Sequence, residues 1–480
     1  MLAALALGLR TADLTRRPMH ADEANQGVKT GELLEHGRYT FDPKDHHGPT
    51  LYYAALPIAW VRGESTLGSL TETSLRLVPA LAGTAAVVLL MLLVRAASTD
   101  LGRIPATTPW LALVAGAFLA LSPPAVYYSR YFIQETLLSA FTLAAIFAGI
   151  RWWQTGRSVW AVAIGVSVGL MLSTKASAPL FLIAAVVAAL AVRPSGRGRQ
   201  NGRRDLALAI VSATAVILVF YSSFGTHPAG LRDFVGTFDF TTRRLAGPTG
   251  HEKPWWYYLG FFGWQHVGGL VWEQLLFGVL ALVGITVAIV RGDPLLRAAG
   301  LYTVIVATVL SLTPYKTPWH VIHLVPGAAI LAAGALAAAG RLRTGRLLAL
   351  AAGTLCLMSL AQQTRRAAFL RPADPRNPYA YVHSSPDVLK FRTLVETALL
   401  DHPERPVRVI SEEYWPLPWY LRGLPRVGYW TQAPADCDGA LIIASSTQAD
   451  VVQARLKGRY QTNLLGLRPG FICVVYAPNP

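Results

Sequence analysis

Two adjacent carboxylates, Asp22 and Glu23, stand near the start of the chain, in the segment HADEA at positions 20–24. Removing charged groups from water is costly, so an acidic pair at the head of a long apolar protein requires a reason. Such a pair is typical of an acid/base site or a metal site. A simpler interpretation stays open, in which Asp22 caps a helix and Glu23 is solvated. We expect the residues from Gly31 to Tyr53 to form an ordered surface loop.

Two neighbouring histidines, His46 and His47, follow in that loop. Imidazole and carboxylate groups are legitimate metal ligands, so a divalent metal held together with the acidic pair is one alternative. Adjacent histidines rarely bind one ion together. We therefore expect His46 and His47 to contact substrate or to be structural, and we expect no bound metal or other cofactor.

The elements that must position these residues are helices that span a membrane. The chain has 480 residues, of which 53% are hydrophobic and 15% are charged, whereas globular proteins average about 25% charged residues. A bilayer core requires about 20 helical residues. We therefore predict an α-helical polytopic membrane domain from ten apolar runs: 75–94, 110–122, 133–150, 158–172, 179–192, 206–223, 267–290, 295–312, 320–339 and 347–361. Three of them are short and predict extended, broken or re-entrant helices: 110–122, 158–172 and 179–192.

The loops between these runs alternate in charge, which predicts an orientation. Every second loop is basic and, by the positive-inside rule, faces the cytosol. The segment that carries Asp22, the loop at 224–266 and the C-terminal tail are then extracytoplasmic. The net charge of +16 is spread over these loops and is not gathered on one domain, which argues against nucleic acid as a partner. The cytosolic clusters contain Arg95, Arg103, Arg151, Arg157, Arg193, Arg197, Arg199, Arg203, Arg204, Arg291, Arg297, Arg341, Arg343 and Arg346.

The two ends of the chain differ from the ten runs. Met1–Leu9 has about half the length of a span, which predicts a truncated first span followed by a catalytic first loop at about 10–74. We predict a membrane domain at 1–363 and a soluble extracytoplasmic domain at 364–480. Strands at 407–410, 440–444 and 471–476, with helices that start at Ser385 and Ser446, predict that this second domain is a small α/β domain.

Two features of the tail leave alternatives open. Cys437 and Cys473 lie on the predicted extracytoplasmic side, where a disulfide would persist, but the sequence does not give their separation. The aromatic segment 415–420 (WPLPWY) would suit sugar stacking on an extended, proline-stiffened chain. A hydrophobic edge that packs the tail onto the membrane domain is at least equally consistent with this segment.

The order of several motifs resembles a known family. They are HADEA (20–24), GELLEHGRY (31–39), HGP (47–49), YSR (128–130) with Glu135, TPYKTPW (313–319), PWYLR (418–422) and LRPG (467–470). Together they resemble the predicted membrane-bound mannosyltransferases, which are similar to the dolichyl-phosphate-mannose–protein mannosyltransferases of the GT-C superfamily. Some relatives are associated with flippase activity in archaeal protein glycosylation.

The resemblance implies a GT-C-like fold and transfer of a mannose-like sugar from a polyprenyl-phosphate donor to an acceptor hydroxyl. In this group the first extracytoplasmic loop supplies an acidic base, and Asp22 matches that position with Glu23 as its companion. Inverting transfer requires one carboxylate to remove the acceptor proton, not the carboxylate pair of a glycosidase. A protein, a lipid and a glycan all remain open as acceptors.

Cations are expected around the leaving phosphate, because they stabilise its developing charge. Arg130 is the first choice, since a guanidinium suits bidentate phosphate contact, and Lys316 and His320 are further candidates. An interfacial arginine that reaches out to water is the alternative for Arg130. Three more residues are candidates for substrate contact: Glu135, Arg243 and Arg244.

Two other classes of protein remain open. One is a transporter or a flippase partner without transferase chemistry. A proton-coupled carrier would usually bury ionisable residues in the middle of its spans, and most of these runs lack them. The other is a non-catalytic protein of cell-envelope glycan assembly that keeps the scaffold, because a fold does not determine a function.

Overall fold

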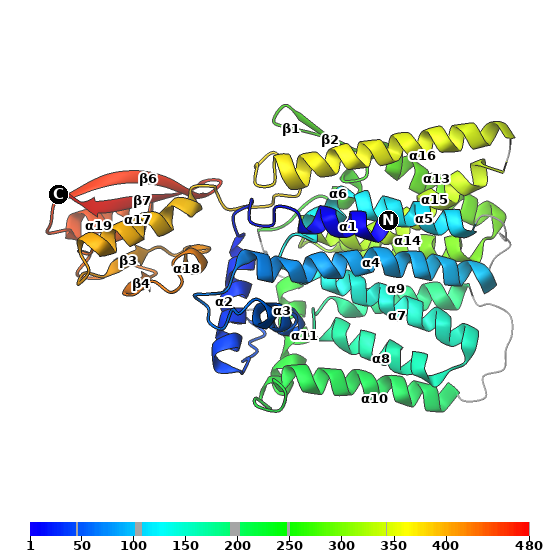
Figure 1. Cartoon of the computed structure of the whole chain (residues 1–480), viewed down its shortest axis with the longest axis horizontal. Helices are drawn as coiled ribbons and strands as arrows, with labels where there is room; N and C mark the ends of the chain where they lie inside the picture. The colour runs from blue at the N-terminus through cyan, green and yellow to red at the C-terminus, as the bar shows by residue number, and fades with distance from the viewer. Residues whose placement is uncertain (45–46, 101–107, 193–201, 247–249, 342, 480) are drawn as a thin grey trace. The chain divides into compact units, whose positions relative to one another are not determined.

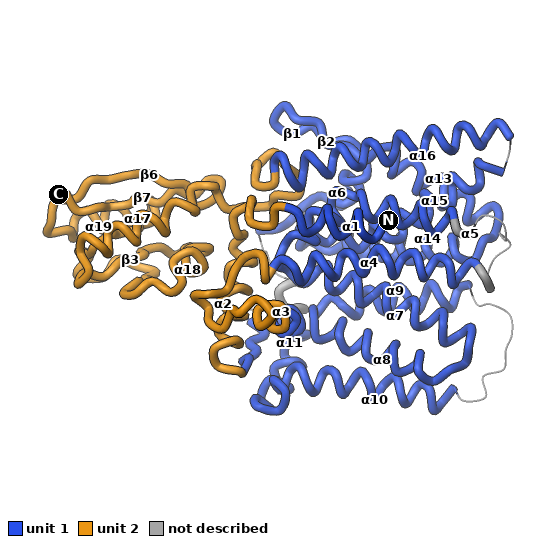
Figure 2. Tube along the Cα trace, in the orientation of Figure 1, with its two compact units in different colours: residues 1–12, 38–54, 76–371 blue, residues 13–37, 55–75, 372–480 orange. Residues whose placement is uncertain are grey.

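The structure is a computed structural model that describes every residue except 45–46, 101–107, 193–201, 247–249, 342 and 480. The chain forms two compact units, which Figure 2 shows in different colours. Unit 1 contains residues 1–12, 38–54 and 76–371, and unit 2 contains residues 13–37, 55–75 and 372–480. The segment that carries Asp22 therefore belongs to the same unit as the C-terminal domain.

Unit 1 is a helical bundle that also contains the short hairpin of β1 and β2 (Figure 1). Two helices, α3 (Thr50–Val61) and α4 (Glu72–Asp100), have residues in both units. The other elements are α1 (Leu2–Thr11), α5 (Thr108–Leu121), α6 (Pro123–Tyr128), α7 (Glu135–Thr155), α8 (Ser158–Leu172), α9 (Ala178–Ala191), α10 (Gly202–Tyr221), α11 (Gly230–Ala246), α12 (Tyr257–Gly260), β1 (Trp264–Val267), β2 (Leu270–Glu273), α13 (Leu275–Arg291), α14 (Pro294–Leu312), the 3₁₀ helix η1 (Pro318–His323), α15 (Val325–Ala339), α16 (Arg343–Thr364) and the π-helical turn η2 (Arg365–Leu370).

Each of the ten predicted runs contains one helix, which confirms a polytopic α-helical membrane protein. Among the described residues, five helices are long and apolar enough to cross a membrane: α4, α7, α10, α14 and α16. The runs at 267–290 and 320–339 contain α-helices that are shorter than the runs themselves, because other local structure precedes each helix. Residues 270–273 pair with β1 before α13 begins, and Pro318 opens η1 before α15 begins. The predicted loop at 224–266 contains two helices, α11 and α12, and β1.

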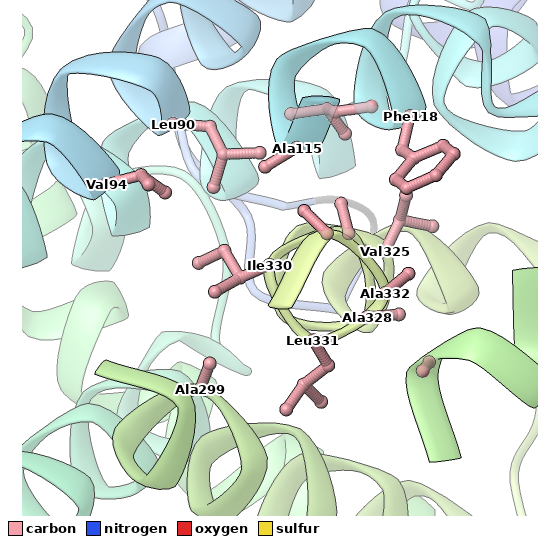
Figure 3. Packing of buried hydrophobic residues seen from close by; sticks show 14 of the residues in the cluster. Leu90, Val94, Ala115, Phe118, Ala299, Val325, Ala328, Ile330, Leu331 and Ala332 are labelled. Atoms are coloured by element: carbon pink, nitrogen blue, oxygen red, sulfur yellow. The ribbon is translucent and has the colours of Figure 1, made fainter. Parts of the chain in front are cut away.

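The core of unit 1 surrounds α15, which packs against α5, α13, α14 and α16. Figure 3 shows Ile330 and Leu331 of α15 pointing in different directions from the helix axis, toward its neighbours. Small residues let the backbones approach closely. A Cβ on Gly284 of α13 would lie 2.1 Å from the carbonyl oxygen of Leu331, so a side chain at position 284 would force the two helices apart.

The C-terminal part of unit 2 contains a five-stranded sheet in the order β4-β3-β5-β7-β6. The pairs β3–β4 and β3–β5 are parallel, whereas β5–β7 and β6–β7 are antiparallel. A small α/β domain is therefore confirmed. Its elements are α17 (Val388–Asp401), β3 (Val407–Ile410), α18 (Leu417–Tyr420), β4 (Val427–Trp430), β5 (Leu441–Ser445), α19 (Ala449–Arg455), β6 (Tyr460–Arg468) and β7 (Phe471–Pro478), and unit 2 also holds α2 (Ala21–His36).

Local polar contacts shift the predicted helix starts in this domain. The expected cap, Ser385, instead accepts a hydrogen bond from the backbone N–H of Asp387, and α17 begins at Val388. Side-chain bonds of this kind compete with helix formation. Likewise α19 begins at Ala449, three residues after the expected cap. Cys437 and Cys473 are both buried and free, and burial raises the pKa of each thiol, that of Cys473 to about 12.

Two predictions of irregular structure were wrong. Both ends of the expected surface loop are helical: α2 extends to His36 and ends at Gly37, whose φ of 65° is a conformation that glycine adopts readily, and α3 begins at Thr50. The aromatic segment is not extended either, because residues 417–420 form α18 with proline in its first turn. Trp419 is fully buried in unit 2, which favours the packing interpretation of that segment.

Candidate active site

The acidic pair lies in the first turn of α2, where a capping box holds it. The Nδ1 of His20 accepts a hydrogen bond from the backbone N–H of Asp22 at 3.1 Å. In return, Oε2 of Glu23 accepts from the backbone N–H of His20 at 3.1 Å. Two otherwise unpaired N–H groups of the helix are thus satisfied, and negative charge is favoured at this end of a helix. The helix cap is therefore His20 and not Asp22.

Glu23 is enclosed by protein. Its side chain is 0% exposed, and its Oε1 accepts from Nη2 of Arg17 at 3.0 Å in an ion pair in which Arg17 is also buried. The interpretation of Glu23 as a solvated residue was wrong. Both of its carboxylate oxygens are engaged, one by the helix cap and one by Arg17.

Asp22 has the opposite environment. Its side chain is 48% exposed, and its Oδ2 lies 3.8 Å from Nδ1 of His20. One face of this carboxylate is therefore open to an incoming group, while its backbone is fixed by the capping box. Of the two acidic residues, Asp22 is the one whose carboxylate is accessible from outside the protein.

Residues of the C-terminal domain surround the segment before α2. The Nε2 of His383 lies 3.3 Å from Nη1 of Arg17. The backbone of Met19 donates to the hydroxyl of Tyr420 at 2.7 Å and accepts from Oγ of Ser384 at 2.7 Å. Sequence reasoning missed these partners, because they lie more than 360 positions further along the chain.

Unit 1 holds a second cluster of polar groups. Glu135 is the first residue of α7, Lys175 follows α8, and His320 lies in η1. Lys175 forms an ion pair with the carboxylate of Glu135. The Nε2 of His320 lies 3.3 Å from Nζ of Lys175 and 3.5 Å from Oε1 of Glu135. All three side chains are buried, so each group stabilises the charge or dipole of the next in a poorly solvated environment.

Further contacts orient His320 and bring His47 near this cluster. The hydroxyl of Tyr258 lies 3.2 Å from Nδ1 of His320 and donates to the carbonyl of Thr317 at 3.1 Å. The backbone of Gly48 donates to the carbonyl of Thr174 at 3.1 Å, next to Lys175. His47 is close enough to interact electrostatically with His320. Three predicted residues, Glu135, His320 and His47, therefore lie together.

The other predicted cations contact main-chain carbonyls. Arg130 is buried and donates to the carbonyls of Leu9, at 3.2 Å, and Ala12, and its guanidinium lies 4.5 Å from the ring centroid of Phe369. The alternative of an arginine that reaches out to water was therefore wrong. Lys316 is also buried and donates to the carbonyl of Thr313. Donor binding by Arg130 and Lys316 stays a prediction.

Three predicted substrate contacts lie wholly or partly outside the described part of the chain. His46 lies outside the described residues. Arg243 and Arg244 lie on α11, but their side chains are outside the described part of the chain. Within the described ranges, His, Cys, Asp and Glu side chains form no group of three or more that could hold a metal ion, and the metal requirement stays a prediction.

Comparisons with known proteins agree with this architecture. Residues 58–223 match the dolichyl-phosphate-mannose-protein mannosyltransferase family. Among solved structures, ArnT from Cupriavidus metallidurans bound to undecaprenyl phosphate is similar over 99% of this chain and 97% of its own, with a TM-score of 0.68 and 16% identity. The archaeal oligosaccharyltransferase AglB from Archaeoglobus fulgidus, in complex with an inhibitory peptide and a dolichol-phosphate, is similar over 100% of this chain and 73% of its own, with a TM-score of 0.57 and 13% identity.

The chain is therefore a multi-pass membrane protein with the GT-C fold. Its segment 58–223 is mannosyltransferase-like in sequence. A comparison with curated protein sequences gives no match.

Proposed function

We propose that this protein is an inverting glycosyltransferase that moves a mannose-like sugar from a polyprenyl-phosphate donor to an acceptor hydroxyl. The observation that carries the proposal is the contrast between the exposed carboxylate of Asp22 and the buried, paired carboxylate of Glu23. One accessible carboxylate on a rigid support is what proton removal from an acceptor requires.

In the proposed reaction Asp22 is the general base. The acceptor hydroxyl gives its proton to the carboxylate of Asp22 while its oxygen forms a bond to the anomeric carbon of the sugar. The bond from that carbon to the phosphate oxygen breaks, and its electron pair leaves with the polyprenyl phosphate. Attack opposite the leaving group inverts the anomeric configuration. Glu23 does not touch the substrate in this scheme and serves to hold α2 and Arg17.

The leaving phosphate requires nearby positive charge, because negative charge develops on it as the bond breaks. In unit 1, the ammonium of Lys175 is one candidate for such a group, and Glu135 holds it in place. Arg130, Lys316 and His320 remain the candidates from the sequence. The similarity to ArnT bound to undecaprenyl phosphate and to AglB in complex with a dolichol-phosphate supports a polyprenyl phosphate as the carrier.

We place the active site and the C-terminal domain on the extracytoplasmic side. The alternation of basic loops along the chain supports this orientation. Arginine clusters collect on the cytosolic side of membrane proteins. The acceptor is a protein, a lipid or a glycan that carries a free hydroxyl.

The test is sugar transfer by the full-length protein in lipid nanodiscs. A polyprenyl phosphate with radiolabelled mannose is the donor, and both transfer and donor hydrolysis are measured. Asp22→Asn is compared with Glu32→Gln, which alters an exposed carboxylate on the same helix. We expect Asp22→Asn to be inactive and Glu32→Gln to be active. If the unaltered protein releases no sugar from any polyprenyl carrier, the proposal fails and a non-catalytic flippase-associated or transport protein becomes the better interpretation.

A further inference from the structure

A buried polar chain within unit 2 links the C-terminal domain to Asp22. It begins at His383, passes through Arg17 to Glu23, and reaches the cap residue His20, whose Nδ1 holds the backbone of Asp22. Four of these side chains are buried, at 6% exposure or less for each residue: His383, Arg17, Glu23 and His20. The exposed carboxylate thus stands at the outer end of an otherwise enclosed network.

The donors and acceptors in this chain determine the protonation of both histidines. A guanidinium can only donate, so Nε2 of His383 must accept from Arg17. The proton of a neutral His383 is then on Nδ1, which faces the carbonyl of Ser384 at 3.2 Å. A backbone N–H also only donates, so Nδ1 of His20 must be unprotonated to cap α2. The network is complete only with a neutral His383.

His383 also contacts the cap residue directly. The rings of His20 and His383 lie edge to face, with centroids 5.8 Å apart and planes at 65°. His383 therefore meets the base-bearing turn in two ways, through Arg17 to Glu23 and through the ring of His20. A change in its ring or acceptor atom alters both supports of the first turn of α2.

We propose that His383 is a positioning residue for the base Asp22. The inference rests on the proposed function, since it assumes that Asp22 is the base. His383 touches no reacting atom. It holds Arg17, and through Arg17 and Glu23 it fixes the orientation of the turn that presents the Asp22 carboxylate. A misplacement of a catalytic group by about 1 Å lowers turnover by on the order of 10²-fold.

The test compares His383→Phe with His383→Gln in the full-length protein in nanodiscs. Phe keeps an aromatic ring and removes the acceptor, whereas the amide oxygen of Gln can still accept from Arg17. We expect His383→Phe to lower kcat by on the order of 10-fold to 10²-fold with an unchanged KM for the donor, and His383→Gln to recover most of kcat. The matched control is Val395→Ala, which shortens a buried apolar side chain of α17 and removes no member of this network.

The outcomes separate the inference from the proposed function. If transfer requires Asp22 but His383→Phe and Val395→Ala have the same kcat, the positioning role is overturned while the proposed function stands. If the unaltered protein transfers no sugar, the proposed function fails first.

A second measurement is independent of activity. With ¹³C-labelled histidine, the NMR signals of His20 and His383 should both shift in Glu23→Gln and not in Glu32→Gln. An unshifted His383 signal would contradict the network itself.

Discussion

Asp22 and Glu23 are adjacent in the sequence, yet the side chain of Asp22 is 48% exposed and that of Glu23 is 0% exposed. The first turn of α2 creates this difference, because it directs Glu23 back toward the backbone of His20 and toward Arg17. The two carboxylates therefore have different environments. One is accessible, and the other supports the start of the helix.

The first prediction concerns the base. Asp22→Asn keeps the size of the side chain but removes its ability to accept a proton. We expect donor binding to survive and turnover to fall by about 10²–10⁴-fold, the range for loss of general base catalysis. Single-turnover transfer from a labelled polyprenyl-phosphate sugar measures both quantities. Normal turnover in Asp22→Asn would mean that the base lies elsewhere.

The second prediction concerns the buried ion pair. Arg17→Met leaves the carboxylate of Glu23 buried without its partner, which destabilises a fold by about 3–5 kcal/mol. The double variant Arg17→Met/Glu23→Gln removes the charge as well and should be less destabilised. Hydrogen exchange of the amides of α2 in the full-length protein measures the change. Equal protection of α2 in the single and double variants would show that the ion pair does not stabilise this helix.

Much of this architecture follows from local patterns. The run 158–172 matches α8, and the strand expected at 407–410 has the same bounds as β3, because apolar periodicity is set by neighbouring residues. The strand β6 was missed, since its residues are mostly exposed and lack a continuous apolar face. β4 is only half-buried and equally gives no strong signal.

The candidate site was harder to predict because its contacts are not local. The acidic pair and, in unit 1, Glu135, His320 and the nearby His47 were found from residue type and motif order. One partner of Arg17 lies 366 positions away, at His383, and Lys175 was not among the predicted site residues. No periodicity in one sequence reveals which distant polar groups meet. Pairings of this kind arise from tertiary packing, which supplies the buried environment that makes them necessary.

The third prediction concerns the donor phosphate. Arg130→Ala should weaken donor binding or turnover by about 2–4 kcal/mol if its guanidinium contacts the phosphate, and Arg130→Lys should retain only part of the activity. Because Arg130 also binds the carbonyls of Leu9 and Ala12, the amount of folded protein must be measured beside the KM for the donor. A lower yield of folded protein with an unchanged KM would assign Arg130 to structure.

The same assay tests Lys175. The double variant Lys175→Met/Glu135→Gln removes both charges of the ion pair, so that neither is left buried alone. We expect a higher KM for the donor than in Lys390→Met, which removes an exposed lysine of α17 whose side chain is 63% exposed. An unchanged KM in the double variant would exclude Lys175 as a phosphate-binding group.

The fourth prediction is the topology. A reporter that is active only outside the cytosol, fused after residue 480, should be active, because the basic loops hold the other side in the cytosol. A reporter in the loop between α9 and α10 should be inactive. An inactive reporter at the C-terminal fusion, together with an active reporter between α9 and α10, would contradict the proposed orientation of Asp22.

The last prediction is a pH dependence that originates at His383. Burial is the main reason that the pKa of His383 lies well below its ordinary value of 6.5. The charge of Arg17 and the neighbouring His20 lower this pKa further, whereas Glu23 raises it. Above pH 6.5 the histidine is neutral in both the folded and the unfolded chain, so it contributes no pH dependence there. Below pH 6.5 the unfolded chain takes up a proton that the folded chain does not. The free energy of unfolding should therefore fall by up to about 1.4 kcal/mol per pH unit from pH 6.5 down to the lowered pKa.

Hydrogen exchange of the amides of α2 and α17, compared between pH 7.5 and pH 5.5, measures this slope. His383→Gln removes the titrating group and keeps an acceptor for Arg17, so it should flatten the slope in this range. His402→Gln, at the end of α17, is the matched control and should keep the slope of the unaltered protein. Protonation of His383 in the folded protein would prevent Nε2 from accepting from Arg17, so sugar transfer should decline only at the lower pH at which the folded protein itself takes up that proton. An identical slope in His383→Gln would show that another group titrates, and that the neutral His383 is not what keeps the turn of Asp22 in place.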